Sequence, residues 1–199
     1  PLPKYVQETL SKHNISLSPT LGMGKVEGAL LDTLAFQSHR YPDVDMPYLL
    51  NQIAGWQTAK AKLPTWATNE DIIYPPHLSM EQCSSEQTAG YKLQLAARLL
   101  TTATGSNAAS HALSQIVPES LLVDLTGGFG VDFSFISRCF ERAVYVEQQK
   151  KLCEVAQHNF QVLGLSQVEV VHADSTEYLH SLSHATLIYL DPARRNEQG

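Results

Sequence analysis

The sequence predicts an α/β fold in which a Rossmann-like, doubly wound parallel sheet follows a smaller α-helical region. Three observations predict it. Four short apolar runs alternate with longer stretches in the second half of the chain, a glycine-rich turn follows the first run, and helical periodicity without such runs fills the first part. Runs that are apolar on both faces are typical of parallel strands covered by helices on each side.

The region 1–76 is expected to be a small helical domain. One helix is expected from Tyr48 to Leu63, because Pro64 cannot continue it. The consecutive prolines at positions 75 and 76 impose extended backbone, so the domain boundary is placed there. The second domain then covers residues 77–199.

Helix and strand signals alternate through the second domain. Two capping-box patterns, Ser79 with Gln82 and Ser84 with Gln87, predict a helix before the first apolar run. The runs themselves predict strands over 121–124, 143–147, 168–172 and 187–191. Between the second and third runs, helical spacing predicts a helix that Gly164 caps.

The turn after the first strand carries the strongest functional signal. The strand is expected to end in Asp124, and Gly127, Gly128 and Gly130 follow. Glycines let the backbone approach a ligand, helix N–H groups attract negative charge, and the carboxylate can hold a cation. This combination suits a nucleoside that carries both charges. Asp132 has two equally good interpretations: it is either the N-cap of the following helix or a contact for the ligand.

The other three runs also finish on, or within two residues of, a carboxylate. Ligands of open α/β sheets lie at the carboxyl ends of the strands. Glu147 lies 20 residues after Gly127, the spacing at which a carboxylate reaches ribose hydroxyls. Asp174 is expected to accept a hydrogen bond from the adenine amine. A dinucleotide fingerprint would need a third glycine where Phe133 stands.

The glycine turn resembles the first motif of class I S-adenosylmethionine-dependent methyltransferases, an acidic residue followed by glycines at two-residue steps. Asp124, Gly128 and Gly130 match this motif, and Thr126 replaces its first glycine. The resemblance implies that the cofactor is S-adenosyl-L-methionine. The residues implied to bind it are Asp124, Thr126, Gly127, Gly128, Gly130, Glu147 and Asp174.

The fourth run, Leu187 to Arg194, looks like the catalytic motif of the same family. It implies catalytic roles for Asp191 and Pro192, and Arg194 is a candidate contact for substrate phosphate or else a solvated side chain. Amino-group methyltransferases carry a second proline and an aromatic residue where this chain has Ala193 and Arg194. The run is closer to that of RNA uracil-C5 methyltransferases, whose cysteine nucleophile would lie downstream.

Two segments, 78–89 and 191–195, are similar to bacterial methyltransferases with a THUMP-like domain at their C-terminal end. That resemblance implies RNA, either rRNA or tRNA, as the substrate, with the RNA-binding domain outside these residues. Two other classes of function stay open. One is an NAD(P)-dependent oxidoreductase that uses the same ribose-binding carboxylate, and the other is a non-catalytic nucleoside-binding or RNA-binding module.

Composition limits the remaining classes. With 43% hydrophobic and 17% charged residues the chain is typical of soluble globular proteins, and no apolar run is long enough to span a membrane, so a cytoplasmic protein is expected. Three cysteines without a CxxC pair argue against a zinc site, and no metal is expected. A net charge of −6 gives no general attraction to RNA.

The sheet of the family that the chain resembles has seven strands in the order 3-2-1-4-5-7-6, and this sequence supplies four. We therefore expect a methyltransferase domain truncated after its fourth strand. An apolar strand with one open edge is expected to associate with a second copy or to destabilise the domain. Methyl transfer by these residues alone is expected to be lost.

Overall fold

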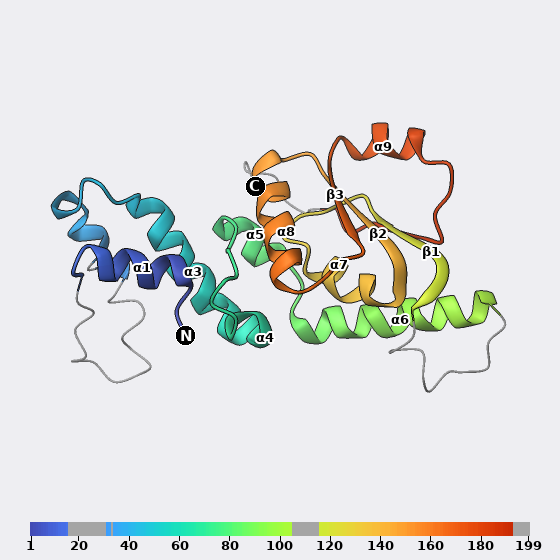
Figure 1. Ribbon diagram of the computed structural model, residues 1–199, viewed down its shortest axis with the longest axis horizontal. Helices are drawn as coiled ribbons and strands as arrows, with labels where there is room; N and C mark the ends of the chain where they lie inside the picture. The colour runs from blue at the N-terminus through green and yellow to red at the C-terminus, as the bar shows by residue number, and fades with distance from the viewer. Residues whose placement is uncertain (16–30, 33, 105–115, 193–199) are drawn as a thin grey trace. The chain divides into compact units, whose positions relative to one another are not determined.

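The computed structural model describes residues 1–15, 31–32, 34–104 and 116–192 (Figure 1). The chain forms two compact units, Pro1–Met80 and Glu81–Gly199. The boundary expected from the sequence lies after residue 76, a few residues before this division.

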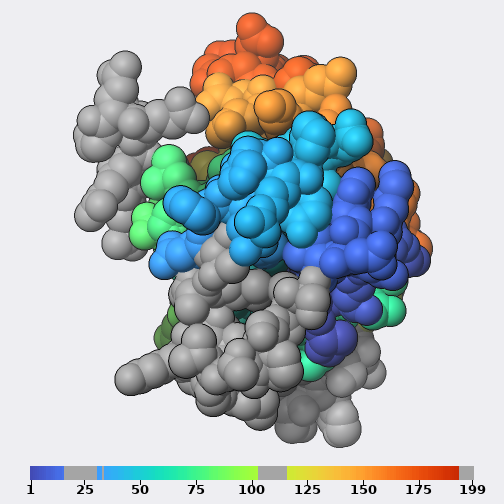
Figure 2. Space-filling view, turned by 90° about the vertical axis from the view of Figure 1, so that its left-hand side faces the viewer, coloured from blue at the N-terminus to red at the C-terminus, as the bar shows by residue number. Residues whose placement is uncertain are grey.

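The first unit is helical in its described part. Its elements are α1 (Lys4–Lys12), the 3-10 helix η1 (Ser38–Arg40), α3 (Met46–Lys62), α4 (Pro64–Ala67) and most of α5 (His77–Gln82). The side chain of Asp45 caps α3 by accepting a hydrogen bond from the Tyr48 N–H at 3.0 Å. Val6 of α1 packs with Leu49 and Ile53 of α3, and the two helices lie side by side on the face shown in Figure 2.

The second unit is an α/β sandwich around a parallel sheet. Its helices are α6 (Glu86–Thr104), α7 (Val131–Ile136), the 3-10 helix η3 (Ser137–Cys139), α8 (Lys150–Val162) and α9 (Ser175–Ser181). Its strands are β1 (Val117–Asp124), β2 (Phe140–Glu147), β3 (Val168–His172) and β4 (Leu187–Tyr189). The strand order is β3-β2-β1-β4 and all pairs are parallel, which confirms the predicted Rossmann-like class.

Alternate residues of the central strands pack on opposite faces of the sheet. Leu122 of β1 and Tyr145 of β2 face α6, α7 and α8. Val123 and Val144 face the other way, toward α9. Figure 1 shows α9 on one side of the strands and α6 with α7 on the other. The last five residues of β1 and of β2 are buried on both faces, which explains the apolar runs there, whereas the residues of the outer strands β3 and β4 are half-buried or exposed.

Several element ends differ from the sequence prediction, among them those of α3, which covers Met46–Lys62 instead of Tyr48 to Leu63. β1 and β2 begin at Val117 and Phe140, which pair with each other before the register shifts. β4 ends at Tyr189 rather than at Asp191. The hydroxyl of Ser85, not of the predicted Ser84, accepts the hydrogen bond from the Thr88 N–H near the start of α6.

Apolar side chains are exposed on β4 and α6. Ile188 and the following Leu190 are 41% and 62% exposed, and Tyr91 and Leu99 lie open on α6. Self-association through the edge of β4 stays a prediction.

None of the helices in the described ranges has the length and apolar character that a membrane span requires.

Candidate functional site

The glycine turn between β1 and α7 has a backbone that favours glycine. The φ angles of Gly127, Gly128 and Gly130 are 28°, 65° and 78°. A Cβ on Gly127 would lie 2.7 Å from both the Val146 carbonyl oxygen and the Glu147 Cβ. Gly127 therefore allows the turn to approach the end of β2 more closely than any other residue would.

Glu147 and Tyr145 fix the turn to β2. The Glu147 Oε2 accepts a hydrogen bond from the Gly128 N–H at 2.9 Å, and its Oε1 accepts one from the Gln149 N–H at 2.8 Å. The Tyr145 hydroxyl donates a hydrogen bond to the carbonyl oxygen of the same glycine, Gly128. The turn is thus held at one residue by both a carboxylate and a phenol.

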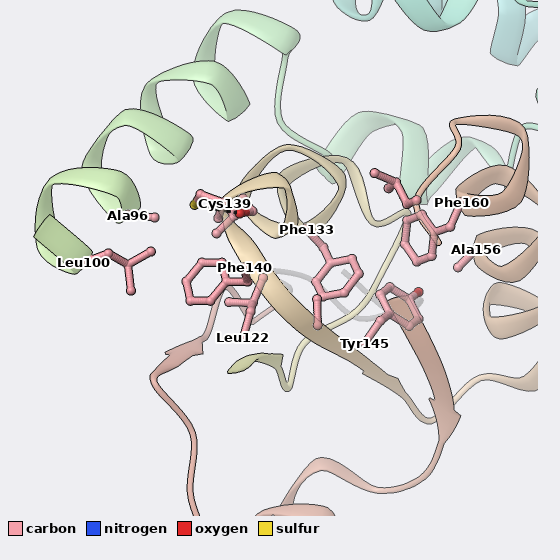
Figure 3. Packing of buried hydrophobic residues seen from close by; sticks show 12 residues of the cluster. Ala96, Leu100, Leu122, Phe133, Cys139, Phe140, Tyr145, Ala156 and Phe160 are labelled. Atoms are coloured by element: carbon pink, nitrogen blue, oxygen red, sulfur yellow. Dashed lines mark hydrogen bonds between the residues drawn. The ribbon is translucent and has the colours of Figure 1, made fainter. Parts of the chain in front are cut away.

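An aromatic cluster supports this arrangement from the core. The ring centroid of Phe133 lies 5.6 Å from that of Tyr145 and 5.2 Å from that of Phe160. Figure 3 shows the three rings turned toward one another. Burial raises the pKa of Tyr145, and the charges of Glu147 and Asp124 raise it further, so the phenol remains a proton donor. A bulky Phe133 fills the position of the third glycine of a dinucleotide fingerprint.

Asp124 is a buried carboxyl group at the end of β1. Its Oδ1 accepts hydrogen bonds from the Thr126 N–H at 2.8 Å and from the Thr126 hydroxyl at 3.0 Å. Burial raises the pKa of Asp124 to about 7, although the bonds from Thr126 oppose the shift. Its neighbours in the sheet register are Tyr145 and Tyr189. A cation beside this group would favour the ionised form.

Asp191 lies next to the same turn. Its backbone N–H donates to the Thr126 hydroxyl oxygen at 2.9 Å. Thr126, which replaces a glycine of the motif, therefore contacts both the last residue of β1, Asp124, and a residue that follows β4, Asp191. Pro192 is exposed beside Asp191, and Arg194 lies outside the described residues.

A polar cluster connects Asp191 to α6. The Lys92 ammonium lies 2.7 Å from Asp132 Oδ2, 2.7 Å from the Tyr189 hydroxyl and 3.1 Å from Asp191 Oδ2. The Ser84 hydroxyl donates to Asp132 Oδ2 at 2.9 Å. Four elements therefore meet at one lysine: the segment before α6, α6 itself, α7 and the end of β4.

Asp132 is not the helix N-cap that one interpretation of the sequence expected. Gly130 occupies the N-cap position of α7, and Asp132 lies in its first turn. Its side chain points to Lys92 instead. One of its oxygens, Oδ1, is buried and accepts no hydrogen bond from any part of the chain that the structure describes.

Asp174 has a local structural role. It is the N-cap of α9, and its Oδ1 accepts hydrogen bonds from the Thr176 and Glu177 N–H groups at 2.8 and 3.1 Å. The structure does not join it to the glycine turn, whereas it does bring Asp124, Thr126, Glu147 and Asp191 together.

Sequence reasoning missed Lys92, Tyr189 and Tyr145. A signal for the lysine exists in the spacing of α6, since Ala89 and Ala96 lie three residues before and four after it and are buried. A lysine on the apolar stripe of an amphipathic helix needs a partner for its charge. The two tyrosines looked like ordinary apolar strand residues.

No group of three or more His, Cys, Asp or Glu side chains within the described ranges is arranged to hold a metal ion. The negative charge of this site is instead balanced in part by Lys92. Asp132 and Asp191 share that one cation, and Asp124 lies close by.

The chain resembles known proteins in two comparisons. Residues 103–198 match the family described as Conserved hypothetical protein 95. A solved structure described as "putative methyltransferase from Porphyromonas gingivalis W83" is 27% identical and superposes with a TM-score of 0.59. No curated protein matches the chain.

The similarity to the Porphyromonas gingivalis structure covers 88% of this chain and 43% of that one, so the chain spans less than half of its length. Together with the β3-β2-β1-β4 order, the two matches support a methyltransferase fold.

Proposed function

We propose that this chain forms the S-adenosylmethionine-binding part of a methyltransferase that acts on RNA. One observation carries the proposal: the glycine turn lies between carboxylates at the ends of two adjacent parallel strands, Asp124 and Glu147, and Glu147 is bonded to the turn itself. Ligands of open α/β sheets bind at this edge.

The residues of the turn fit the adenosine part of this cofactor. Each Glu147 oxygen accepts one backbone N–H, and a carboxylate oxygen can accept a second donor such as a ribose hydroxyl. A Cβ on Gly128 would meet its nearest described neighbour, the Thr126 carbonyl oxygen, only at 3.7 Å. Space for a ligand therefore remains against this glycine. Asp174 Oδ2, the oxygen that does not cap α9, is the proposed acceptor for the adenine amine.

The charge of the site fits a sulfonium cation. Asp132 and Asp191 share Lys92, and Asp124 interacts electrostatically with Asp132, so three carboxyl groups lie near one lysine. A positively charged ligand next to Asp124 lowers the cost of ionising that buried group. A neutral ligand gives no such gain.

When bound, S-adenosylmethionine supplies an electrophilic methyl group. Asp191 would orient the nucleophile of the methyl acceptor or take its proton, and Pro192 would border the acceptor. Thr126 fixes the backbone of Asp191 relative to the turn. The rate would come mainly from alignment of the acceptor with the methyl carbon, which depends on how firmly Asp191 is held.

RNA is the proposed substrate on the likeness of segments 78–89 and 191–195 to THUMP-like-domain methyltransferases. The chain carries a net charge of −6, so its hold on RNA phosphates would need local contacts such as Arg194 and an RNA-binding domain outside these residues. The substrate is proposed to be rRNA or tRNA.

Two measurements test the proposal. Titration calorimetry of the intact protein with S-adenosylhomocysteine should show binding, while NAD should give no heat of binding at the same concentrations. Tritiated S-adenosylmethionine should then label RNA purified from cells that lack the protein. Binding of NAD without S-adenosylhomocysteine would favour an oxidoreductase, and cofactor binding without labelling of RNA would contradict the RNA substrate.

A further inference from the structure

Lys92 lies on the inward face of α6, where burial of its charged side chain costs free energy. Its side chain is only 25% exposed, and its neighbours on the helix stripe, Ala89 and Ala96, are buried. Burial of an ammonium group is unfavourable unless charged or polar partners surround it. The contacts of the ammonium group must therefore offset the cost of burying it.

The contacts of the ammonium exceed what it can satisfy. Asp132 Oδ2, Asp191 Oδ2, the Tyr189 hydroxyl and the Ser84 hydroxyl all lie within 3.1 Å, and an ammonium has three protons. The Tyr189 hydroxyl also has one proton and two carboxylate neighbours, Asp132 at 2.8 Å and Asp191 at 3.3 Å. Asp132 is thus the tighter partner of both donors.

Asp191 depends on this cluster more than Asp132 does. The side chain of Asp132 is 12% exposed and is also held by Ser84, whereas the side chain of Asp191 is 48% exposed. Packing alone does not fix a carboxylate with that much solvent access. The bonds from Lys92 and Tyr189 both end on Asp191 Oδ2, so they orient Oδ1 away from the cluster.

Lys92 stays a cation in this position. Burial lowers its pKa, but the hydrogen bonds from its ammonium to Asp132 and Asp191 outweigh burial and raise the pKa above its ordinary value. A permanently protonated amine cannot act as the base. It can hold a carboxylate.

We infer that Lys92 is a positioning residue for methyl transfer, which holds the Asp191 carboxylate with its free oxygen toward the methyl acceptor. The inference rests on the proposed function and adds a residue to it from a helix outside the cofactor turn. In the step that Asp191 serves, the acceptor forms a bond to the methyl carbon while the carbon–sulfur bond breaks. The sulfur keeps the electron pair, and the proton of the acceptor passes to Asp191 or to water.

The test separates positioning from folding. In Lys92→Met we expect the rate constant of methyl transfer at saturating S-adenosylmethionine and RNA to fall about 100-fold, the usual effect of a misplacement of about 1 Å. The dissociation constant for S-adenosylhomocysteine should change less than about threefold, because Lys92 does not contact the glycine turn. Lys92→Arg keeps the charge and should recover most of the rate. Lys12→Met, at an exposed lysine of α1, is the matched control.

The outcomes are distinct. An active wild type whose Lys92→Met variant transfers methyl groups equally fast overturns the inference alone. Parallel loss of cofactor affinity and transfer in both Lys92→Met and Lys92→Arg also overturns it, because it marks the lysine as a folding residue. A wild-type protein that binds S-adenosylhomocysteine but methylates no RNA contradicts the proposed function and this inference with it.

Discussion

The Thr126 hydroxyl accepts a hydrogen bond from the Asp191 N–H at 2.9 Å and donates one to Asp124 Oδ1 at 3.0 Å. The methyltransferase motif that this turn resembles has a glycine at this position. A glycine has no hydroxyl group and could make neither bond. The threonine therefore links the ends of β1 and β4 through one oxygen atom. It makes the position of Asp191 depend on the glycine turn.

Thr126→Val should separate these residues while keeping the shape of the side chain. The buried Asp124 would lose one of its donors, at a cost of about 1–2 kcal/mol in the free energy of unfolding. Methyl transfer should fall about tenfold or more as Asp191 loosens. Urea unfolding and a transfer assay measure the two effects. Thr126→Ser retains the hydroxyl and is the control, and equal urea midpoints for the two variants would contradict the assigned role.

The fold was predictable because short strand-like runs alternate with stretches of helical spacing in the second half of the chain. Val168–His172 was predicted with its observed ends, and Gly164, with a φ of 72°, follows α8 as expected. The start of β1 was not predictable. Pro118 and a Glu119 with a φ of 58° interrupt it, and only the pairing of Val117 with Phe140 makes it a strand.

The site was predictable only where topology fixes it. Glu147 ends β2 and Asp191 follows β4, and both strands pair in parallel with β1, which ends in Asp124, so the edge that these residues share follows from strand order. Lys92 reaches the site from α6, and although its spacing from Ala89 and Ala96 indicates that it faces inward, the residues that its ammonium contacts depend on how α6 packs against the rest of the unit, which no local pattern encodes. The role of Asp174 could not be predicted either. A carboxylate between a strand and a helix is expected both for a ligand contact and for a helix N-cap, and in the structure Asp174 is the N-cap of α9.

Glu147→Gln should weaken cofactor binding without unfolding the protein. The amide keeps the size of the side chain but loses the charge, and its NH2 group replaces the acceptor of either the Gly128 N–H or the Gln149 N–H, so a ribose hydroxyl that donates to that oxygen loses its acceptor as well. A loss of about 1–3 kcal/mol corresponds to roughly 5- to 150-fold in the dissociation constant for S-adenosylhomocysteine. Calorimetry measures it, with Glu154→Gln on the exposed face of α8 as control. Unchanged affinity in Glu147→Gln would remove the main support for the cofactor assignment.

Gly127→Ala should be far more harmful than Gly164→Ala. Both glycines have a positive φ, 28° and 72°, so both variants incur backbone strain of about 1 kcal/mol. Only at Gly127 would the new Cβ also collide with the backbone, 2.7 Å from the Val146 carbonyl oxygen, whereas Gly164 has open space among the described residues. Thermal unfolding should show a larger drop in Tm for Gly127→Ala, together with loss of S-adenosylhomocysteine binding. A similar drop for both variants would mean that the turn can move away from β2.

Asp124 should make stability depend on pH in the direction opposite to most carboxylates. Burial raises its pKa from 3.8 to about 7 in the folded state. Below the lower value the group is protonated in both states. Between the two values the folded protein keeps a proton that the unfolded chain has lost, so the free energy of unfolding should fall as pH rises from about 4 to about 7. Asp124→Asn should lack this contribution, and urea titrations of both proteins across that range measure the difference.

The same group should make cofactor binding tighten as the pH rises through its folded-state pKa of about 7. A sulfonium cation favours ionised Asp124, and the ionised fraction of a group with a pKa of about 7 rises about tenfold between pH 6 and pH 8. Affinity for S-adenosylmethionine should rise by up to that factor, and affinity for S-adenosylhomocysteine, whose sulfur is neutral, should rise less. Asp124→Asn should bind the sulfonium weakly at every pH. Equal pH profiles for the two ligands in the wild-type protein would show that Asp124 does not sense the charge on sulfur, and the fit of this site to a cation would then rest on Asp132 and Asp191 alone.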